Sequence, residues 1–251
     1  LKGCDSEIIM DRALPFIEKS VQASIPFFTV IWFHAPHAPV VGHPKYMKEL
    51  YSEQSKPKQH FYSVVTALDA QMGRLRAKLR ELGVADNTLL AFTSDNGPEG
   101  NPGKVNRYQG SAAHFRGRKR SLYEGGIRVP SLIEWPAKVQ AGMLVDKPAV
   151  TSDYFPTLCH ILGYDLPPER PYDGINLLPV LSGKKQKRKH PIGFYFLAQK
   201  QETLIDDRYK LMHNLGEKRP RSDNGKTAYA NYDLYDLIDD PSETTNLADT
   251  S

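Results

Sequence analysis

Two apolar segments with an amphipathic segment between them constrain the fold of this 251-residue chain most strongly. Residues 27–33 and 88–93 are apolar on both faces of an extended chain, which is typical of a parallel sheet covered by helices on each side. Between them, apolar residues recur at steps of three and four over 61–82 and stop at Gly83, the pattern of a helix and its C-cap. The sequence therefore predicts an α/β fold that contains a right-handed βαβ unit.

The elements outside this unit indicate a second, smaller region at the C-terminal end. Helices are predicted over residues 5–20 and 153–162, and a third strand over 129–135. Short alternating segments then predict a small antiparallel sheet at 193–197, 202–205, 209–213 and 232–237. We therefore expect one domain over residues 1–185 and a small-sheet domain over 186–251, with a long exposed connection over 216–226.

The net charge of +4 comes from one local run of basic residues, because subtracting its five charges leaves −1. The run consists of Lys184, Lys185, Lys187, Arg188 and Lys189. We interpret it as a solvated loop, so no nucleic-acid partner is predicted. No apolar run approaches the about 18 residues of a membrane span. Cys4 and Cys159 show no recognisable spacing and are expected to be buried free thiols.

Polar residues follow both predicted strands of the βαβ unit. Asp95 and Asn96 come directly after the strand at 88–93, and His34 and His37 follow the strand at 27–33. In open α/β sheets ligands gather beyond the carboxyl ends of the strands, so we expect these residues at one edge. Asp95 and Asn96 offer one charged and one neutral oxygen for Ca²⁺ or Mg²⁺, although two ligands are too few for either ion. A simple turn is the alternative interpretation of this sequence.

A basic, glycine-rich loop over residues 117–130 precedes the third predicted strand. Lys119 lies in this loop among several arginines, which predicts a site for a multiply charged oxyanion. These arginines are Arg116, Arg118, Arg120 and Arg128. The alternative is a solvated basic face whose arginines pair with carboxylates such as Glu124.

Histidines near these segments are candidates for proton transfer and substrate contact. His37 could protonate a leaving alcohol or hold a substrate oxygen near neutral pH. A histidine at a strand end can also have a purely structural role, with its ring nitrogens hydrogen-bonded to backbone groups. The catalytic and the structural interpretation of His37 both stay open at this point. His114 is a weaker candidate for contact with a substrate.

Taken together, these motifs resemble the sulfatases that use a formylglycine nucleophile, within the alkaline phosphatase superfamily. The resemblance covers nearly the whole chain and rests on the segments 34–37, 67–69, 73–75, 86–88, 93–97, Lys119 with 123–130, 153–158, 173–177, 234–237, 240–241, Glu243 and 246–248. It implies an alkaline-phosphatase-like α/β/α sandwich with a small C-terminal antiparallel sheet beside it. It also implies export to a periplasmic, extracellular or lysosomal compartment.

The resemblance assigns roles residue by residue. Asp95 and Asn96 would be two ligands of a divalent cation, usually calcium in this family, with magnesium as the other candidate. Lys119 would bind the sulfate and offset developing charge, and His37 would be the general acid. His34, His114 and Arg118 are our further candidates for substrate contact.

The chain departs from the family pattern at the nucleophile. Formylglycine arises from the first residue of a motif with Cys or Ser, any residue, Pro, any residue and Arg, and neither Cys4 nor Cys159 begins such a motif. The paired N-terminal aspartates of the metal site are also absent from the sequence. The chain therefore resembles roughly the C-terminal half of a sulfatase, and formylglycine is expected in an N-terminal part that precedes it.

The expected function is that of a sulfuric ester hydrolase acting on a sulfated small molecule or carbohydrate. On its own, this segment is expected to be inactive. One alternative is a phosphatase or phosphodiesterase of the same superfamily. Another is a non-catalytic remnant that binds sulfated glycans through its basic loop.

Overall fold

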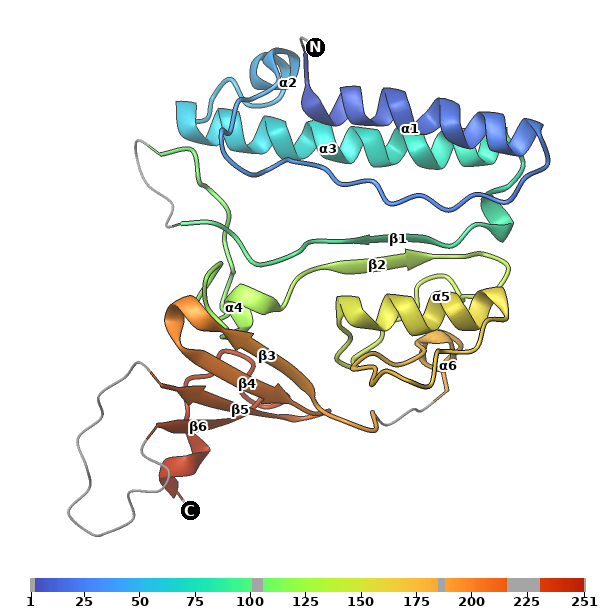
Figure 1. Ribbon diagram of the computed structural model, residues 1–251. Helices are drawn as coiled ribbons and strands as arrows, with labels where there is room; N and C mark the ends of the chain where they lie inside the picture. The colour runs from blue at the N-terminus through green and yellow to red at the C-terminus, as the bar shows by residue number, and fades with distance from the viewer. Residues whose placement is uncertain (1–2, 101–105, 185–187, 216–230, 251) are drawn as a thin grey trace. The chain divides into compact units, whose positions relative to one another are not determined.

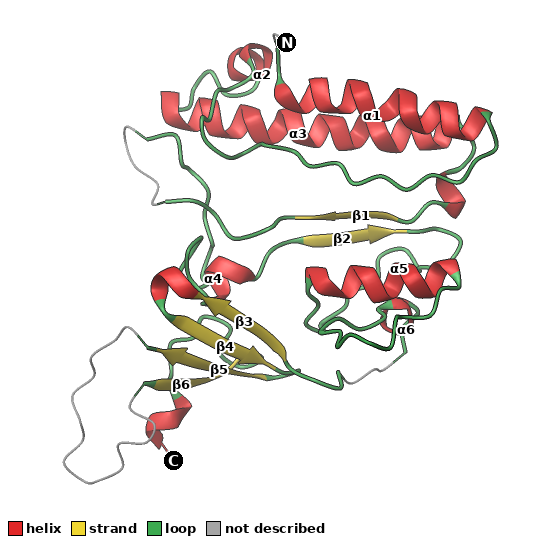
Figure 2. Cartoon of the chain, in the orientation of Figure 1, coloured by secondary structure: helices red, strands yellow, loops and turns green. Residues whose placement is uncertain are grey.

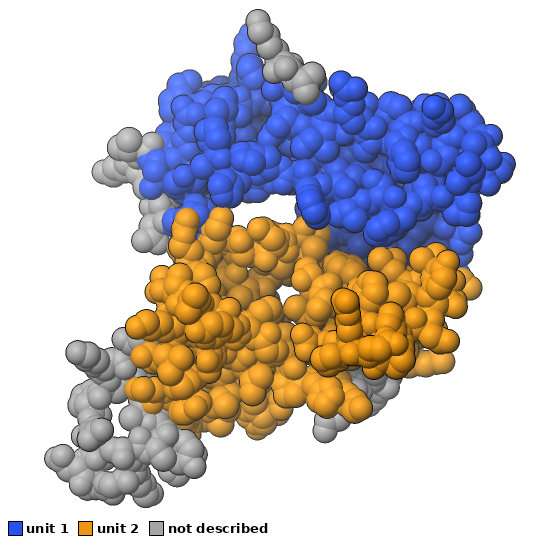
Figure 3. Space-filling view, in the orientation of Figure 1, with its two compact units in different colours: residues 1–92, 98–111, 132–137 blue, residues 93–97, 112–131, 138–251 orange. Residues whose placement is uncertain are grey.

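The computed structural model describes residues 3–100, 106–184, 188–215 and 231–250. The chain divides into two compact units, which Figure 3 colours separately. Unit 1 comprises Leu1–Phe92, Pro98–Ser111 and Leu132–Ala137, and unit 2 comprises Thr93–Gly97, Ala112–Ser131 and Lys138–Ser251. The expected domain boundary between residues 185 and 186 stays a prediction.

Unit 1 is built on a pair of long helices, α1 (Asp5–Gln22) and α3 (Lys56–Glu81), with the short helix α2 (Pro44–Glu49) beside α3 (Figure 1). Acidic residues occupy the first turn of α1, where they complement the helix dipole. The two helices bury the core residues Met10, Ile17, Leu75 and Leu79 between them. Both predicted helices are confirmed, and the second is followed by a short 3₁₀ turn, η1 (Ala85–Asn87).

The predicted strand at residues 27–33 is wrong, because this segment forms no strand ladder with any described residue. Its side chains alternate: Phe27, Ile31 and Phe33 pack on the core of α1 and α3. Phe28, Val30 and Trp32 are 67%, 59% and 84% exposed. An apolar pattern can predict two covered faces, but a strand also needs a hydrogen-bonded neighbour. The predicted βαβ unit is therefore not formed by the described part of the chain.

The other two predicted strands of the α/β region are confirmed. They are β1 (Leu90–Thr93) and β2 (Ser131–Glu134), which pair as a two-stranded sheet and run in opposite directions in Figure 2. The carboxylate of Glu134 on β2 accepts two hydrogen bonds from Arg76 of α3, at 2.7 and 3.0 Å. This pair joins the end of the sheet to the helix.

Unit 2 contains the short helices α4 (Glu124–Ile127), α5 (Tyr154–Leu162) and α6 (Leu178–Leu181) and the 3₁₀ turn η2 (Thr151–Asp153). The predicted helix at 153–162 is confirmed, and it ends at Gly163, whose φ of +73° favours glycine.

The small C-terminal sheet is also confirmed. Its strands are β3 (Ile192–Phe196), β4 (Gln201–Ile205), β5 (Tyr209–Asn214) and β6 (Tyr232–Asp236), antiparallel in the order β3-β4-β5-β6. One face buries Met212 and Tyr235 against Leu122 and Tyr123. Two short turns, η3 (Leu197–Gln199) and η5 (Leu247–Thr250), flank the strands, and the predicted connection at 216–226 lies outside the described residues.

One member of the basic run is not solvated as predicted. Arg188 is 8% exposed and forms two hydrogen bonds, of 2.8 and 2.9 Å, with the fully buried carboxylate of Asp153. That carboxylate also accepts the backbone N–H groups of Val150 and Ile175 at 2.8 Å. The local charge pattern could not reveal this, because Asp153 is 35 residues away.

Both cysteines are free thiols, as predicted, but they are half-buried rather than fully buried. Across the described residues, no helix combines the length and the apolar character needed to cross a membrane.

Candidate active site

The turn that follows β1 presents two oxygen ligands. Ser94 Oγ donates a hydrogen bond of 3.0 Å to the carbonyl of Asn96, and Asn96 Nδ2 donates one of 2.9 Å to the carbonyl of Gly97. Because the amide nitrogen of Asn96 is engaged, its Oδ1 is left as an acceptor. The side chain of Asp95 is exposed, and no hydrogen bond or ion pair joins it to another described residue. The turn therefore offers one charged and one neutral oxygen.

Close backbone contacts hold this turn against α4. Gly97 N donates a hydrogen bond of 2.8 Å to the carbonyl of Gly126. A Cβ atom on Gly97 would lie 1.9 Å from the carbonyl oxygen of Gly125, and one on Gly126 would lie 2.0 Å from that of Ser121. No side chain can occupy these positions without displacing backbone. The glycines therefore allow three backbone segments to meet.

The third of these segments is the loop that carries Lys119. Gly125 N donates a hydrogen bond of 2.7 Å to the carbonyl of Arg116, which closes the loop at its base. The chain reverses inside the loop at Gly117 and Arg120, with φ of +75° and +71°. Lys119 is half-buried between these two positions. The Asp95-Asn96 turn and the Lys119 loop thus share one backbone junction in unit 2.

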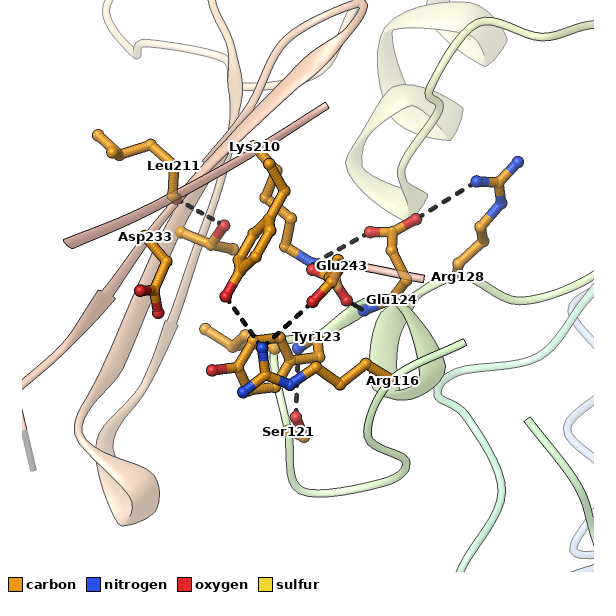
Figure 4. A network of polar contacts seen from close by, with 12 residues as sticks. Arg116, Ser121, Tyr123, Glu124, Arg128, Lys210, Leu211, Asp233 and Glu243 are labelled. Carbon is orange, nitrogen blue, oxygen red and sulfur yellow. Dashed lines mark hydrogen bonds and ion pairs between the residues drawn. The ribbon is translucent and has the colours of Figure 1, made fainter. Parts of the chain in front are cut away.

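A buried ion cluster forms around Glu124, just after the loop in the chain (Figure 4). Lys210 Nζ of β5 lies 3.0 Å from Glu124 Oε1 and 2.8 Å from Glu243 Oε1. Glu243 Oε2 accepts a hydrogen bond of 2.7 Å from the backbone N–H of Glu124. The side chains of Lys210 and Glu243 are fully buried, and that of Glu124 is 6% exposed. Burial raises the pKa of Glu243, while the charge of Lys210 acts in the opposite direction.

Two arginines of the basic loop region have structural partners. Arg128 Nη1 lies 3.5 Å from Glu124 Oε2, which agrees with the predicted alternative of pairing. The guanidinium carbon of Arg116 lies 3.9 Å from the centre of the Tyr123 ring, and its Nη1 donates a hydrogen bond of 2.9 Å to Tyr235 Oη. The guanidinium groups of Arg116 and Arg128 therefore already have partners within the folded protein.

Arg118 and His114 differ from them. Nη1 of Arg118 is buried and has no hydrogen-bond partner within the described structure. An unsatisfied buried donor costs about 1–3 kcal/mol, so an anion that accepts from it would be stabilised. His114 is exposed, with its ring 4.3 Å from that of Phe115. Both residues belong to unit 2, as do Asp95, Asn96 and Lys119.

His34 and His37 belong to unit 1. A turn closed by the hydrogen bond of 2.9 Å from His37 N to the carbonyl of His34 brings their rings to 5.4 Å. Both are exposed, and His34 Nδ1 lies 3.5 Å from Asp5 Oδ2. His37 Nδ1 lies 3.0 Å from the carbonyl of Ala38, which can only accept a hydrogen bond, so Nδ1 is the donor in this contact and Nε2 takes no part in it. The predicted site residues therefore fall into two groups that the two units present separately.

The residues present fit a divalent cation in part. Asp95 and Asn96 supply hard oxygen ligands, whereas Ca²⁺ takes about six to eight. Across the described residues, no group of three or more His, Cys, Asp and Glu side chains is arranged to hold a metal ion. The turn can therefore provide two ligands, and other ligands must come from elsewhere.

Sequence reasoning missed Lys210 and gave Glu243 no role, although Glu243 is among the residues that carry the resemblance. The signal that could have revealed Lys210 is its position in β5. It lies two residues before the buried Met212, so both side chains are on the same, core-facing side of the strand. A lysine at an inward position of a strand requires a buried carboxylate partner.

Comparison with known proteins identifies the family. The family model described as Sulfatase matches residues 1–164, and that described as N-sulphoglucosamine sulphohydrolase, C-terminal, matches residues 113–251. Human steryl-sulfatase is 32% identical over 189 residues, which are 74% of this chain and 31% of that protein. Human N-acetylgalactosamine-6-sulfatase is 32% identical over 197 residues, which are 76% of this chain and 34% of that protein.

Solved structures agree with the fold. The crystal structure of Ps i-CgsB superposes with a TM-score of 0.82 at 24% identity, over 98% of this chain and 51% of that one. A structure from work on the metabolism of multiple glycosaminoglycans by Bacteroides thetaiotaomicron gives a TM-score of 0.77 at 27% identity, over 100% of this chain and 52% of that one. The chain thus spans about a third of the curated relatives cited above and about half of these structures. Its fold is the predicted alkaline-phosphatase-like one, and the chain belongs to the sulfatase family.

Proposed function

We propose that this chain contributes the cation-binding and sulfate-binding residues of a sulfatase active site that hydrolyses sulfate esters. The observation that carries the proposal is the glycine junction, where the Asp95-Asn96 turn packs against the base of the Lys119 loop. A cation and a multiply charged oxyanion need hard oxygen ligands and a fixed ammonium group in one place. The junction joins the two segments that carry these groups.

In this proposal the Asp95 carboxylate and Asn96 Oδ1 are two ligands of a divalent cation, which we take to be Ca²⁺. When bound, the cation supplies Lewis-acid polarisation of a sulfate oxygen. Lys119 binds the sulfate and offsets the charge that develops on it in the transition state. Arg118, whose buried Nη1 has no partner among the described residues, donates to a second sulfate oxygen.

His37 is the proposed general acid. Its Nδ1 donates to the carbonyl of Ala38, so Nε2 is the atom that would deliver a proton to the leaving oxygen. His34 and His114 are proposed to contact the remainder of the substrate. Neither Cys4 nor Cys159 begins the formylglycine motif, so neither residue supplies that nucleophile.

We propose a sulfated carbohydrate as the substrate class. Support comes from relatives named for such substrates, including the human N-acetylgalactosamine-6-sulfatase. A third structure, solved in complex with D-glucosamine-2-N,6-O-disulfate, has a TM-score of 0.53 at 22% identity, which supports the shared fold. Because steryl-sulfatase is also a relative, a sulfated steroid is the competing substrate for the assay.

Turnover of sulfate esters by the full-length protein tests the proposal. Lys119→Ala and His37→Ala are each expected to lower kcat/KM by at least about 100-fold, the scale of a lost transition-state contact. Lys138→Ala, an exposed lysine of unit 2, is the control and should leave kcat/KM unchanged. Wild-type activity in both Lys119→Ala and His37→Ala would overturn the assignment.

Phosphate ester hydrolysis is the second candidate. The phosphonate monoester hydrolase of Agrobacterium radiobacter superposes with a TM-score of 0.52 at 26% identity, over 77% of this chain. A matched pair of aryl sulfate and aryl phosphate substrates distinguishes the two. Higher kcat/KM for the phosphate would replace the sulfatase proposal, and glycan binding without turnover of either ester would favour a non-catalytic role.

A further inference from the structure

We propose that Lys210 is a positioning residue for the sulfate site, acting from the C-terminal sheet through Glu124 and Glu243 on the loop that carries Lys119. This inference rests on the proposed role of Lys119. It adds a function for the C-terminal sheet, which supplies none of the predicted site residues.

Contacts on both sides of Lys119 attach the loop to the C-terminal region. On the N-terminal side, Arg116 Nη1 bonds to Tyr235 Oη of β6 at 2.9 Å. On the C-terminal side, the backbone N–H of Leu122 donates to Gln201 Oε1 of β4 at 3.1 Å. The sheet therefore holds both ends of the segment whose middle carries the proposed sulfate ligand.

The buried ion cluster is a further attachment of the same region to the C-terminal sheet. Lys210 contacts both carboxylates, at 3.0 Å from Glu124 and 2.8 Å from Glu243, in a site closed to solvent (Figure 4). Glu243 also accepts the backbone N–H of Glu124 at 2.7 Å, so side chain and backbone of that residue are both fixed. Breaking such a buried cluster leaves uncompensated charges, and the cluster therefore resists displacement.

Glu124 is directly followed in the chain by the residues that contact the Lys119 loop and the turn after β1. The next two residues are Gly125 and Gly126, whose backbones contact the Lys119 loop and the turn after β1. A rotation of Glu124 would move both of these contacts together. Misplacement of a binding group by about 1 Å can cost about 100-fold in rate, so this anchoring is expected to affect sulfate affinity.

A double-mutant cycle in the full-length protein tests the inference, with the competitive inhibition constant of inorganic sulfate as the readout. Lys210→Met alone leaves two buried carboxylates without their cation, so the variant used is Lys210→Met with Glu243→Gln, which keeps the charge of the cluster at −1. Its inhibition constant is expected to rise at least about fivefold in the wild-type background. In the Lys119→Ala background the same change should have no further effect, because the group that Lys210 positions is gone.

A purely structural role would lower thermal stability and leave the inhibition constant of the folded enzyme unchanged. Arg208→Met is the control: it removes the ion pairs of Arg208 with Asp236 and Asp239, and among the described residues no hydrogen bond or ion pair joins Arg208 to the loop. An equal effect of the cluster variant in both backgrounds would overturn the positioning role, as would an unchanged inhibition constant in the wild-type background. If Lys119→Ala by itself leaves the inhibition constant unchanged, Lys119 does not bind sulfate and the proposed function is overturned. This result is distinguishable from failure of the positioning role of Lys210 alone. If the cluster variant does not fold, Lys210→Arg replaces it, and its cycle with Lys119→Ala is read by the same criteria.

Discussion

The glycine junction allows a strong prediction about a single methyl group. Gly97→Ala would place a Cβ atom 1.9 Å from the carbonyl oxygen of Gly125, whereas ordinary contact begins at 3.4 Å. The two backbones must therefore separate by about 1.5 Å, and the 2.8 Å hydrogen bond from Gly97 N to Gly126 O would be lost. Overpacking costs about 1–3 kcal/mol and the hydrogen bond about 1 kcal/mol, so the free energy of unfolding should fall by about 2–4 kcal/mol.

Urea-induced unfolding of the full-length protein measures this loss. Gly73→Ala is the matched control, because no described atom outside its chain neighbours and the backbone of α3 lies within 4 Å of its Cβ position, and alanine there should stabilise the protein by about 0.5–1 kcal/mol. Turnover of sulfate esters should fall in Gly97→Ala and stay unchanged in Gly73→Ala. An unfolding midpoint and a turnover equal to those of the wild type in Gly97→Ala would refute the close packing of the junction.

Three other perturbations test separate features. Arg188→Leu is expected to lower the free energy of unfolding by about 3–5 kcal/mol, because Asp153 would remain fully buried without its cation; a loss below about 1 kcal/mol in urea unfolding would contradict this. Burial raises the folded pKa of Glu243 above its ordinary value of 4.5. The stability that this proton contributes is therefore fully present below about pH 4.5 and is lost as pH rises through the raised pKa. Glu243→Gln should flatten this part of the curve of unfolding free energy against pH, and curves of identical shape would argue against a raised pKa. Chelation with EDTA should abolish turnover and Ca²⁺ should restore it, while Asp95→Asn should raise the Ca²⁺ concentration required by at least about tenfold. An unchanged Ca²⁺ requirement would exclude Asp95 as a ligand.

Hydrophobic periodicity and turn residues in the sequence correctly predicted the C-terminal strands and the long helices. The small C-terminal sheet followed from alternation with a period of two and from turn residues between strands, and all four strands were confirmed. The helices α1 and α3 followed from periodicity in the same way. The failure at residues 27–33 has the opposite cause, because a strand is defined by a neighbour that the segment itself does not encode.

The candidate site shows the same limit. The Asp95-Asn96 turn and Lys119 could be singled out because their residue types indicate cation and oxyanion chemistry. Their shared junction could not be predicted, since it depends on contacts between Gly97 and residues nearly thirty positions away. The pairing of Lys210 with Glu124 spans 86 positions and left only one local trace, a lysine at an inward position of a strand.

The glycine junction also limits how the specificity of such a site could be altered. A side chain on Gly97 would displace the backbone of Gly125, and one on Gly125 or Gly126 would displace backbone carbonyls of the Lys119 loop. These segments would have to be exchanged as one block in any chimera or library. Diversity is better introduced at His114, which is exposed and does not take part in the junction. A sequence library designed on this basis would vary exposed positions such as His114 and keep the backbone of the junction fixed.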